Sequence, residues 1–394
     1  MIDITRLLCG TVHIGDALRY ADRSEAARPD MLRFALEKKP VVVWNMTRQC
    51  NLSCVHCYAH AKPCADPDEL TTREAQALID DLGQFGAPVL LFSGGEPFVR
   101  PDLYDLGRRA IEHGIRAVIS TNGTLITEEA ALRVKEVGFS YVGVSLDGGR
   151  NTNDRFRGQP GAFDAALEGI RNCHAAGVKA GLRFTVNKRN VNDLPEILDL
   201  LEEERIVRCC IYHLVYAGRG TRLMDEDLSP DETRRVMDLL MERAVDFHQR
   251  GLPTELLTVD NHADGVYLYL RLRERDPERA EEVLTLLRRN GGNSSGVGIG
   301  DVDQRGDVHA DQFWSHYSFG NVRQRPFSQI WTDVSDPIMA GLKNRRPLLK
   351  GRCGACKWQD ICNGNFRVRA EAVYGDVWAQ DPACYMTDEE IGIA

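Results

Sequence analysis

The sequence lacks any apolar run long enough to cross a membrane. Stretches such as Val41–Trp44 and Val89–Phe92 span a few residues, whereas a bilayer needs about 18. A continuous hydrophobic leader is also lacking, because Asp3 and Arg6 interrupt the start of the chain. Basic residues are outnumbered, 49 Lys plus Arg against 58 Asp plus Glu, so the net charge is −9. We therefore expect a cytoplasmic protein without a membrane partner, and without a nucleic-acid partner, which would need a basic surface.

Low-complexity tracts and repeats of solenoid period are absent as well. What remains is the composition of an ordinary globular protein, 43% hydrophobic and 27% charged. A chain of 394 residues is long enough for two or three domains with a large core.

The twelve cysteines are distributed unevenly along the chain. One group lies within eight residues and a second lies near the C-terminus, and clustered cysteines in a cytosolic protein indicate metal ligands rather than disulfides. The first group is Cys50, Cys54 and Cys57, and the second is Cys353, Cys356, Cys362 and Cys384. We interpret the other five as buried small hydrophobic residues: Cys9, Cys64, Cys173, Cys209 and Cys210.

Strand-like and helix-like segments alternate through the first two thirds of the chain. The expected strands are Val41–Met46, Val89–Ser93, Arg116–Ser120, Tyr141–Leu146, Ala180–Val186 and Cys209–Val215. The expected helices are one that begins at Thr71 with a Thr71/Glu74 capping box, then Leu103–His113, Glu128–Val137, Ala162–Ala176, Leu194–Glu204 and Asp231–Gln249. Six such units predict an α/β fold with a parallel sheet.

Periodicity alone does not distinguish a closing barrel from an open sheet, but both place ligands at the carboxyl ends of the strands. The unusual residues follow that rule. Cys50–Cys57 comes after the first strand, Gly94–Pro97 after the second, Thr121–Gly123 after the third and Asp147 after the fourth.

The alternation is expected to stop near residue 250. Two helices, Ala263–Arg275 and Pro277–Asn290, are predicted next, followed by a hairpin over Val297–Ala310 that turns at Gln304–Asp307. We therefore divide the chain into an N-terminal segment (1–38), a barrel-like domain (39–251) and a smaller C-terminal domain (252–394).

Three thiolates on one loop can hold an iron–sulfur cluster, and a cubane with three protein ligands leaves one iron open to a small molecule. A zinc site is the alternative. It would need a fourth ligand, for which Cys64, His56 and His60 are the candidates.

Cys50 to Cys57 resembles the C-x3-C-x2-C signature of the radical S-adenosylmethionine (SAM) superfamily, and Gly94-Gly95-Glu96-Pro97 resembles its GGE segment. The resemblance implies a partial (β/α)6 barrel in which Cys50, Cys54 and Cys57 bind a catalytic [4Fe–4S] cluster. It also implies that the open iron binds SAM, and that one electron cleaves SAM to a 5′-deoxyadenosyl radical.

The remaining strand ends supply candidates for the SAM pocket. Gly94 and Gly95 permit close backbone approach, and Glu96 can anchor the SAM ammonium directly or through the backbone. Asn122, Ser145 and Asp147 can meet the ribose or carboxylate, although Ser and Asp there can equally cap helices. Arg183 can pair with the carboxylate as a fork. His56 departs from the resemblance, because an aromatic residue usually stands there.

The second cysteine group supplies four thiolates, enough to complete a [4Fe–4S] cluster or to bind zinc. Its surroundings resemble the SPASM-type (or twitch-like) extension of radical SAM proteins, with Gly320-Asn321-Val322 and Ile330-Trp331 matching a recurrent stretch. Ser294, Ser295 and Asp311 stand where a full extension has cysteines. The resemblance therefore implies one auxiliary cluster, hence two [4Fe–4S] clusters in total.

Four further segments resemble the radical SAM proteins of haem d1 biosynthesis: Tyr212–Gly220, Gly292–Gly296, Gly320–Phe327 and Arg352–Asn365. This implies removal of two propionates from the tetrapyrrole 12,18-didecarboxysirohaem, with an external one-electron reductant. Alternatives are a peptide maturase, an iron-coproporphyrin decarboxylase, or a non-catalytic iron–sulfur or zinc scaffold. Arg219, Arg323 and Arg325 are candidates for binding the carboxylates. We assign no iron ligand among His213, His262, His309 and His316.

Overall fold

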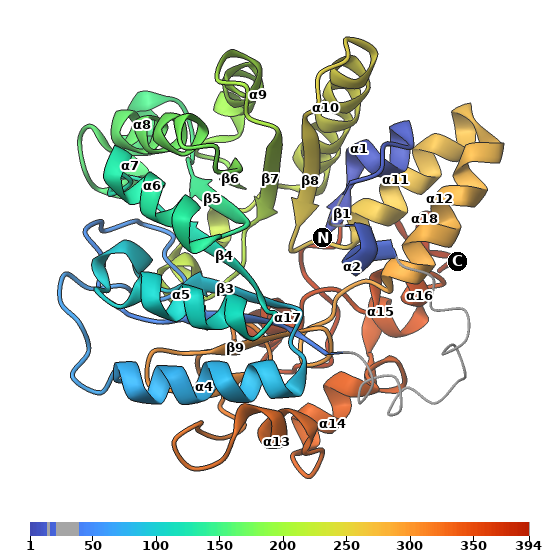
Figure 1. Ribbon diagram of the computed structural model, residues 1–394. Coiled ribbons are helices and arrows are strands. Elements are labelled where there is room, and N and C mark those ends of the chain that lie inside the picture. The colour runs from blue at the N-terminus through green and yellow to red at the C-terminus, as the bar shows by residue number, and fades with distance from the viewer. Residues whose placement is uncertain (14–15, 21–38, 394) are drawn as a thin grey trace.

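One sheet of ten strands organises the protein, as seen in a computed structural model that describes residues 1–13, 16–20 and 39–393. The strand order is β1-β8-β7-β6-β5-β4-β3-β2-β9-β10, and the two edge strands do not pair with each other. Neighbours from β9 through β2 to β8 are parallel, while β1 and β10 are antiparallel to theirs. The sheet is thus a partly closed barrel (Figure 1).

The strands are β1 (Ile2–Asp3), β2 (Val41–Asn45), β3 (Val89–Ser93), β4 (Arg116–Thr121), β5 (Tyr141–Ser145), β6 (Ala180–Val186), β7 (Arg208–His213), β8 (Glu255–Val259), β9 (Ile299–Val302) and β10 (Val308–His309). The helices up to the last barrel strand are α1 (Ile4–Cys9), α2 (Asp16–Tyr20), α4 (Thr72–Phe85), α5 (Leu103–Glu112), α6 (Glu128–Val137), α7 (Arg150–Arg157), α8 (Ala162–Ala175), α9 (Leu194–Glu203) and α10 (Pro230–Gln249). Those that follow are α11 (Ala263–Arg275), α12 (Pro277–Asn290), α13 (Phe327–Thr332), α14 (Pro337–Lys343), α15 (Gly351–Ala355), α16 (Gln359–Cys362), α17 (Arg367–Tyr374) and α18 (Asp388–Ile391).

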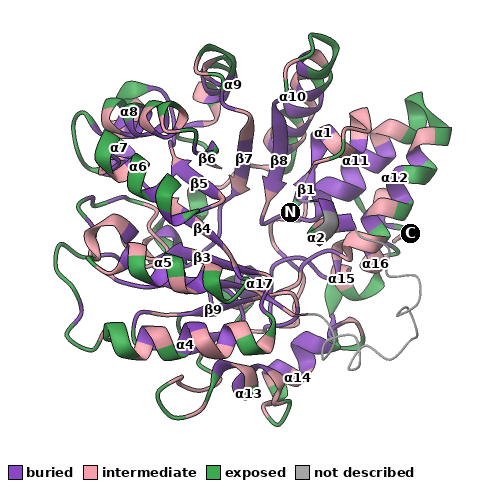
Figure 2. Cartoon of the chain, in the orientation of Figure 1, coloured by how far each residue is buried: buried purple, intermediate pink, exposed green. Residues whose placement is uncertain are grey.

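The six predicted strands and the predicted helices of these units are confirmed, with ends that differ by at most two residues, and helix α7 between β5 and α8 is additional. Helix α4 begins with the expected capping box, since Thr71 and Glu74 bond each other's backbone N–H groups. Figure 2 shows the outer faces of α4, α5 and α6 exposed and the strands behind them buried.

Strand β4 shows how the sheet separates its two faces. Ala117, Ile119 and Thr121 are buried beneath the outer helices, whereas Arg116, Val118 and Ser120 on the other face stay partly exposed. Because side chains alternate along a strand, that second face borders a hollow interior.

The prediction that the alternation stops near residue 250 is wrong. Strand β8 follows α10 and pairs in parallel with β7, and β9 pairs in parallel with β2 at the opposite edge. The predicted hairpin is confirmed as β9 and β10. The division at residue 252 stays a prediction, and the sheet runs across it. Residues 21–38 of the predicted N-terminal segment lie outside the described residues.

In the described part of the chain, no helix combines the length and apolar character needed to cross a membrane.

Candidate active site

A cavity of about 180 Å³ lies at the carboxyl ends of the barrel strands. The first cysteine group lines it, together with most of the residues predicted for a SAM pocket. Those that line it are Cys50, Cys54, Cys57, Gly94, Gly95, Asn122, Ser145, Asp147 and Arg183. Residues that are far apart in the sequence therefore meet at one site.

The cysteine loop is held in shape by backbone contacts with other parts of the barrel. Ser53 N and Val55 N donate to the carbonyls of Arg157 and Phe156, at 3.1 and 2.9 Å. On its other side, Arg219 donates from Nε to the Cys54 carbonyl at 2.7 Å and from Nη1 to the Ala61 carbonyl at 2.9 Å. These hydrogen bonds join the cysteine loop to the segments around Arg157 and Arg219.

The donor set of the first cysteine group suits a cluster better than a single metal ion. Cys50, Cys54 and Cys57 line one cavity, and a structural zinc ion would need a fourth ligand beside them. Of the possible fourth zinc ligands, Cys64 and His60 are exposed and His56 pairs with Asp147, so the interpretation of Cys64 as a buried residue is wrong. The loop therefore fits a [4Fe–4S] cluster, and we propose that its three cysteines hold it.

A buried ion pair lies beside the cysteine loop. Arg157 Nη2 is 2.5 Å from Asp147 Oδ2, and Arg157 Nη1 donates to Cys54 Sγ at 3.6 Å. His56 Nε2 is 3.2 Å from the same carboxylate oxygen. Although burial alone would raise it, Arg157 and His56 together hold the pKa of Asp147 well below its usual range. Asp147 therefore stays charged and orients both partners.

Gly94 and Gly95 fit the loop after β3 against the chain that leads into the cysteines. A Cβ at Gly94 would lie 2.5 Å from the Thr47 carbonyl oxygen, and one at Gly95 would lie 2.1 Å from that of Gln49. Gly94 also has φ +124°, which favours glycine. The two glycines therefore let the loop after β3 pack against the backbone of residues 47–49, and they also line the cavity.

Glu96 is completely buried and does not line the cavity. Its carboxylate accepts hydrogen bonds from Asn122 N at 2.8 Å, Thr121 Oγ1 at 2.7 Å and Phe98 N at 3.2 Å. Burial raises the pKa of Glu96 to about 7. Of the two roles expected for it, the structure favours holding the backbone, because Asn122 then reaches Cys50 Sγ with its Nδ2 at 3.8 Å.

Arg183 projects from β6 into the interior. It bonds Ser120 Oγ, lies over the Tyr212 ring at 5.8 Å from its centre, and leaves its Nε without a partner. Among the described residues no carboxylate pairs with it, which leaves the guanidinium available for a carboxylate ligand. Ser145 lines the cavity at the end of β5.

The second cysteine group forms a separate site. Cys353, Cys356, Cys362 and Cys384 line one small cavity. Cys353 Sγ accepts from Asp381 N at 3.4 Å and from Arg367 Nη2 at 3.9 Å. Burial raises the pKa of Cys362 well above its ordinary value. Four converging sulfurs fit a fully ligated cluster, and we propose them as its ligands.

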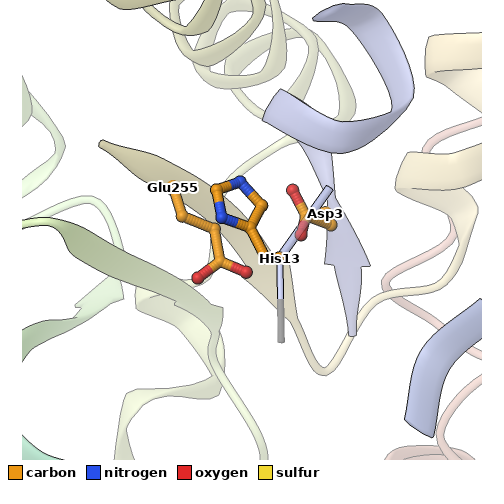
Figure 3. Close-up of side chains that lie close together, drawn as sticks. All are labelled: Asp3, His13 and Glu255. Atoms are coloured by element: carbon orange, nitrogen blue, oxygen red, sulfur yellow. The ribbon is translucent and has the colours of Figure 1, made fainter. Parts of the chain in front are cut away.

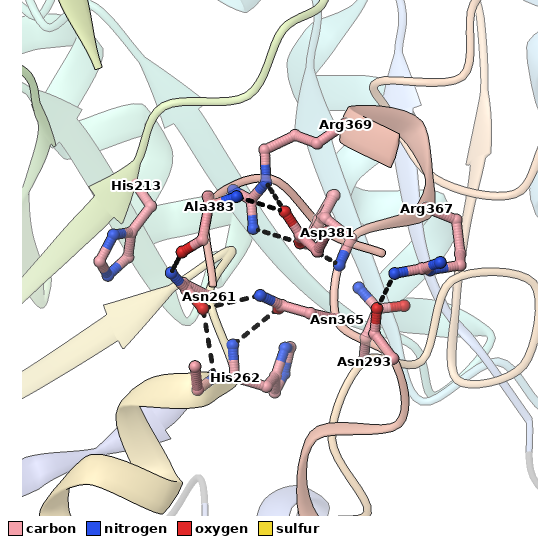
Figure 4. A network of polar contacts seen from close by, with 12 residues as sticks. His213, Asn261, His262, Asn293, Asn365, Arg367, Arg369, Asp381 and Ala383 are labelled. Carbon is pink, nitrogen blue, oxygen red and sulfur yellow. Dashed lines mark hydrogen bonds and ion pairs between the residues drawn. The ribbon is translucent and has the colours of Figure 1, made fainter. Parts of the chain in front are cut away.

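A buried polar network connects this second site to the barrel (Figure 4). Arg369 pairs with Asp381 at 2.9 Å and donates to the Leu214 carbonyl after β7 at 3.2 Å. Asn261, after β8, donates to the Ala383 carbonyl at 3.0 Å and accepts from Asn365 at 2.7 Å. The second cysteine group is therefore joined by buried hydrogen bonds to the segments that follow β7 and β8.

Ser295 and Asp311, which occupy expected cysteine positions, do come together. Ser295 Oγ donates to Asp311 Oδ2 at 2.5 Å, and both residues are buried. A hydrogen bond thus stands where the resemblance would place thiolates.

Three arginines expected to meet substrate carboxylates have other partners. Arg323 pairs with Glu74 at 2.7 Å, Arg325 pairs with Asp333 at 2.6 Å, and Arg219 braces the cysteine loop. The sequence could not show these pairings, because the partners come close to one another only when the chain is folded. Arg157 also belongs to the site, and the sequence carries no signal for it beyond its place on the short polar helix α7.

Asp3, His13 and Glu255 lie close together at the amino end of β8 (Figure 3). Arg19 contacts both carboxylates, Asp3 at 2.8 Å and Glu255 at 2.6 Å. A guanidinium already neutralises this trio, so we do not interpret it as a metal site.

Comparison with known proteins identifies relatives of the whole chain. The radical SAM superfamily profile matches residues 44–201. The Fe-coproporphyrin III synthase of Methanosarcina barkeri is 64% identical over 395 residues, which cover 100% of this chain and 99% of that protein. The Pre-heme d1 synthase of Dinoroseobacter shibae is 48% identical over 360 residues, 90% of this chain and 88% of that protein.

Among solved structures, Streptococcus suis SuiB bound to S-adenosylmethionine matches with a TM-score of 0.68 at 18% identity, over 89% of this chain and 78% of that chain. This likeness shows the fold, that of a SPASM-type radical SAM enzyme. Such enzymes use a [4Fe–4S] cluster and SAM, and SPASM-type members carry auxiliary clusters. The chain therefore belongs to the radical SAM superfamily.

Proposed function

We propose that the protein is a radical SAM enzyme that removes side chains from an iron tetrapyrrole, with iron coproporphyrin III as its product. The observation that carries this proposal is the 64% identity to an Fe-coproporphyrin III synthase over the entire chain. The match covers both cysteine groups, so it supports a shared activity as well as a shared fold.

When bound, a reduced [4Fe–4S] cluster and SAM supply a 5′-deoxyadenosyl radical that takes a hydrogen atom from the substrate. Cys50, Cys54 and Cys57 would hold that cluster beside the cavity. Arg183 would bind the SAM carboxylate as a fork. Gly94 and Gly95 keep the walls of the cavity close to the cysteine loop, which helps to exclude water.

The product named here differs from the one implied by the resemblance to haem d1 enzymes. Coproporphyrin III carries four propionate arms. An enzyme that makes it from 12,18-didecarboxysirohaem must therefore keep the propionates and remove the two acetate arms. Removal of two propionates, the haem d1 step, is the second candidate, which the 48% identity to a Pre-heme d1 synthase supports.

Product mass distinguishes the two candidates. Anaerobically reconstituted enzyme is incubated with 12,18-didecarboxysirohaem, SAM and an external one-electron reductant, and the tetrapyrrole is analysed by mass spectrometry. We expect loss of two acetate arms and the absorption spectrum of a fully conjugated porphyrin. A propionate arm is one methylene heavier than an acetate arm, so loss of two propionates gives a distinguishable product mass. That result would contradict the first candidate function and support the second. An unchanged tetrapyrrole, with SAM cleaved, would refute both.

A further inference from the structure

A second and larger cavity, of about 340 Å³, occupies the opposite end of the barrel. Five of its lining residues are the first residues of barrel strands: Val41, Val89, Arg116, Tyr141 and Arg208. Since the strands are parallel, this end lies across the barrel from the cysteine loop, which follows the carboxyl end of β2. The cavity is thus separate from the proposed cluster site.

The two cavities meet in the middle of the barrel. Arg183, Tyr212, Asp260 and Leu91 line both of them. A ligand that fills the second cavity would therefore contact residues that also line the first cavity, which we propose to hold SAM.

The second cavity carries positive charge within an acidic protein. Arg208 and Arg19 line it, but both pair with Glu255. Arg116 is different, because its Nε donates to Ser140 Oγ at 2.9 Å and none of the described carboxylates pairs with it. Burial, with the nearby charges of Arg208 and Arg19, lowers the pKa of Arg116, and the charge of Glu255 offsets this lowering only in part.

Two carboxylates, Asp260 and Asp311, line this cavity, and burial opposes the ionisation of both. Burial raises the pKa of Asp260 to about 7. Burial also raises the pKa of Asp311, which accepts a hydrogen bond from Ser295. Arg116 and Arg183 line the cavity without a carboxylate partner among the described residues, so the geometry favours an anionic ligand here.

The walls between the charged positions are apolar. Val118, Val259, Ile299 and Phe366 line the cavity along with Leu91. A cavity of this size and character suits a ligand with a hydrophobic body and a few acidic ends.

We propose that this second cavity binds the tetrapyrrole ring, with a carboxylate arm held by Arg116 at the amino ends of the strands. The inference rests on the proposed function and adds a location to it. The ring lies along the apolar walls, and its opposite edge reaches Arg183 and Tyr212, beside the SAM cavity.

Iron coproporphyrin III, titrated by absorbance, tests this site. Arg116→Gln should weaken its binding about tenfold or more, because a charge-assisted hydrogen bond is lost. The same substitution should weaken the binding of iron mesoporphyrin IX less, because that ligand has two propionates in place of four. Val118→Phe, which fills the cavity without changing its charge, should weaken the binding of both. Arg250→Gln is the matched control, since Arg250 is exposed and pairs with Glu202 and Asp246 at the surface.

Melting temperature and iron content, measured on each variant, establish that it is folded. Wild-type affinity in both folded variants, Arg116→Gln and Val118→Phe, would overturn the proposed location and leave the proposed function intact. Wild-type protein that binds no iron tetrapyrrole would overturn the proposed function, and the location with it.

Discussion

Arg157 connects a proposed cluster ligand to a buried carboxylate. Its guanidinium reaches Cys54 Sγ and Asp147 at the same time. A hydrogen bond to a cluster sulfur stabilises the more negative, reduced state, and so raises the reduction potential. Arg157 is therefore a positioning residue that can make the cluster easier to reduce.

Arg157→Lys should lower the reduction potential of the N-terminal cluster. Lysine keeps the positive charge beside Asp147 but loses the planar fork that also reaches sulfur. We expect a negative shift on the order of tens of millivolts, measured by redox titration followed by EPR. Arg155→Lys, on the exposed side of the same helix, is the control. A potential that is unchanged or more positive would contradict this role.

The elements that the sequence predicted well are those whose stability is local. Helix α4 is an example, because its capping box and apolar face are both encoded within a few residues. Strand β8 was missed, although Leu256 and Leu257 are fully buried. Its pairing with β7 and β1 depends on residues far away in the chain, and a five-residue segment carries little signal by itself.

The same contrast holds for the site. The cysteines and glycines stand in short motifs that the sequence displays. The contacts of Arg157 and Arg219 with the cysteine loop arise only when separate strand ends meet, so they required the structure.

Thr71→Ala tests the contribution of the cap on α4. The Thr71 hydroxyl accepts the Glu74 N–H, and losing this bond should lower the free energy of unfolding by about 1 kcal/mol. Denaturant unfolding measures the change. Arg73→Ala, at an exposed position of the same helix, should have a much smaller effect. Equal effects would show that the cap contributes nothing specific.

At the scale of the whole molecule, the two cysteine groups should be separable in function. Reconstituted protein should contain about eight irons, four for each cluster. Cys356→Ala should keep SAM cleavage but lose conversion of the tetrapyrrole, because the first cluster does not depend on that thiol.

Cys54→Ala is the contrasting variant, and it should lose both activities. The measurements are release of 5′-deoxyadenosine and product mass, with Cys173→Ala as a control outside both groups. Equal loss of both activities in Cys356→Ala would make the second site an element of folding. Zinc in place of iron in the purified protein would support the scaffold alternative instead.

The bracing of the cysteine loop by Arg219 and by the backbone of Arg157 has a consequence for how the enzyme survives air. Because hydrogen bonds to other parts of the chain hold this loop, we expect it to keep its conformation when oxidation removes iron and sulfide. We therefore expect exposed enzyme to be recharged under reducing conditions without passing through an unfolded chain.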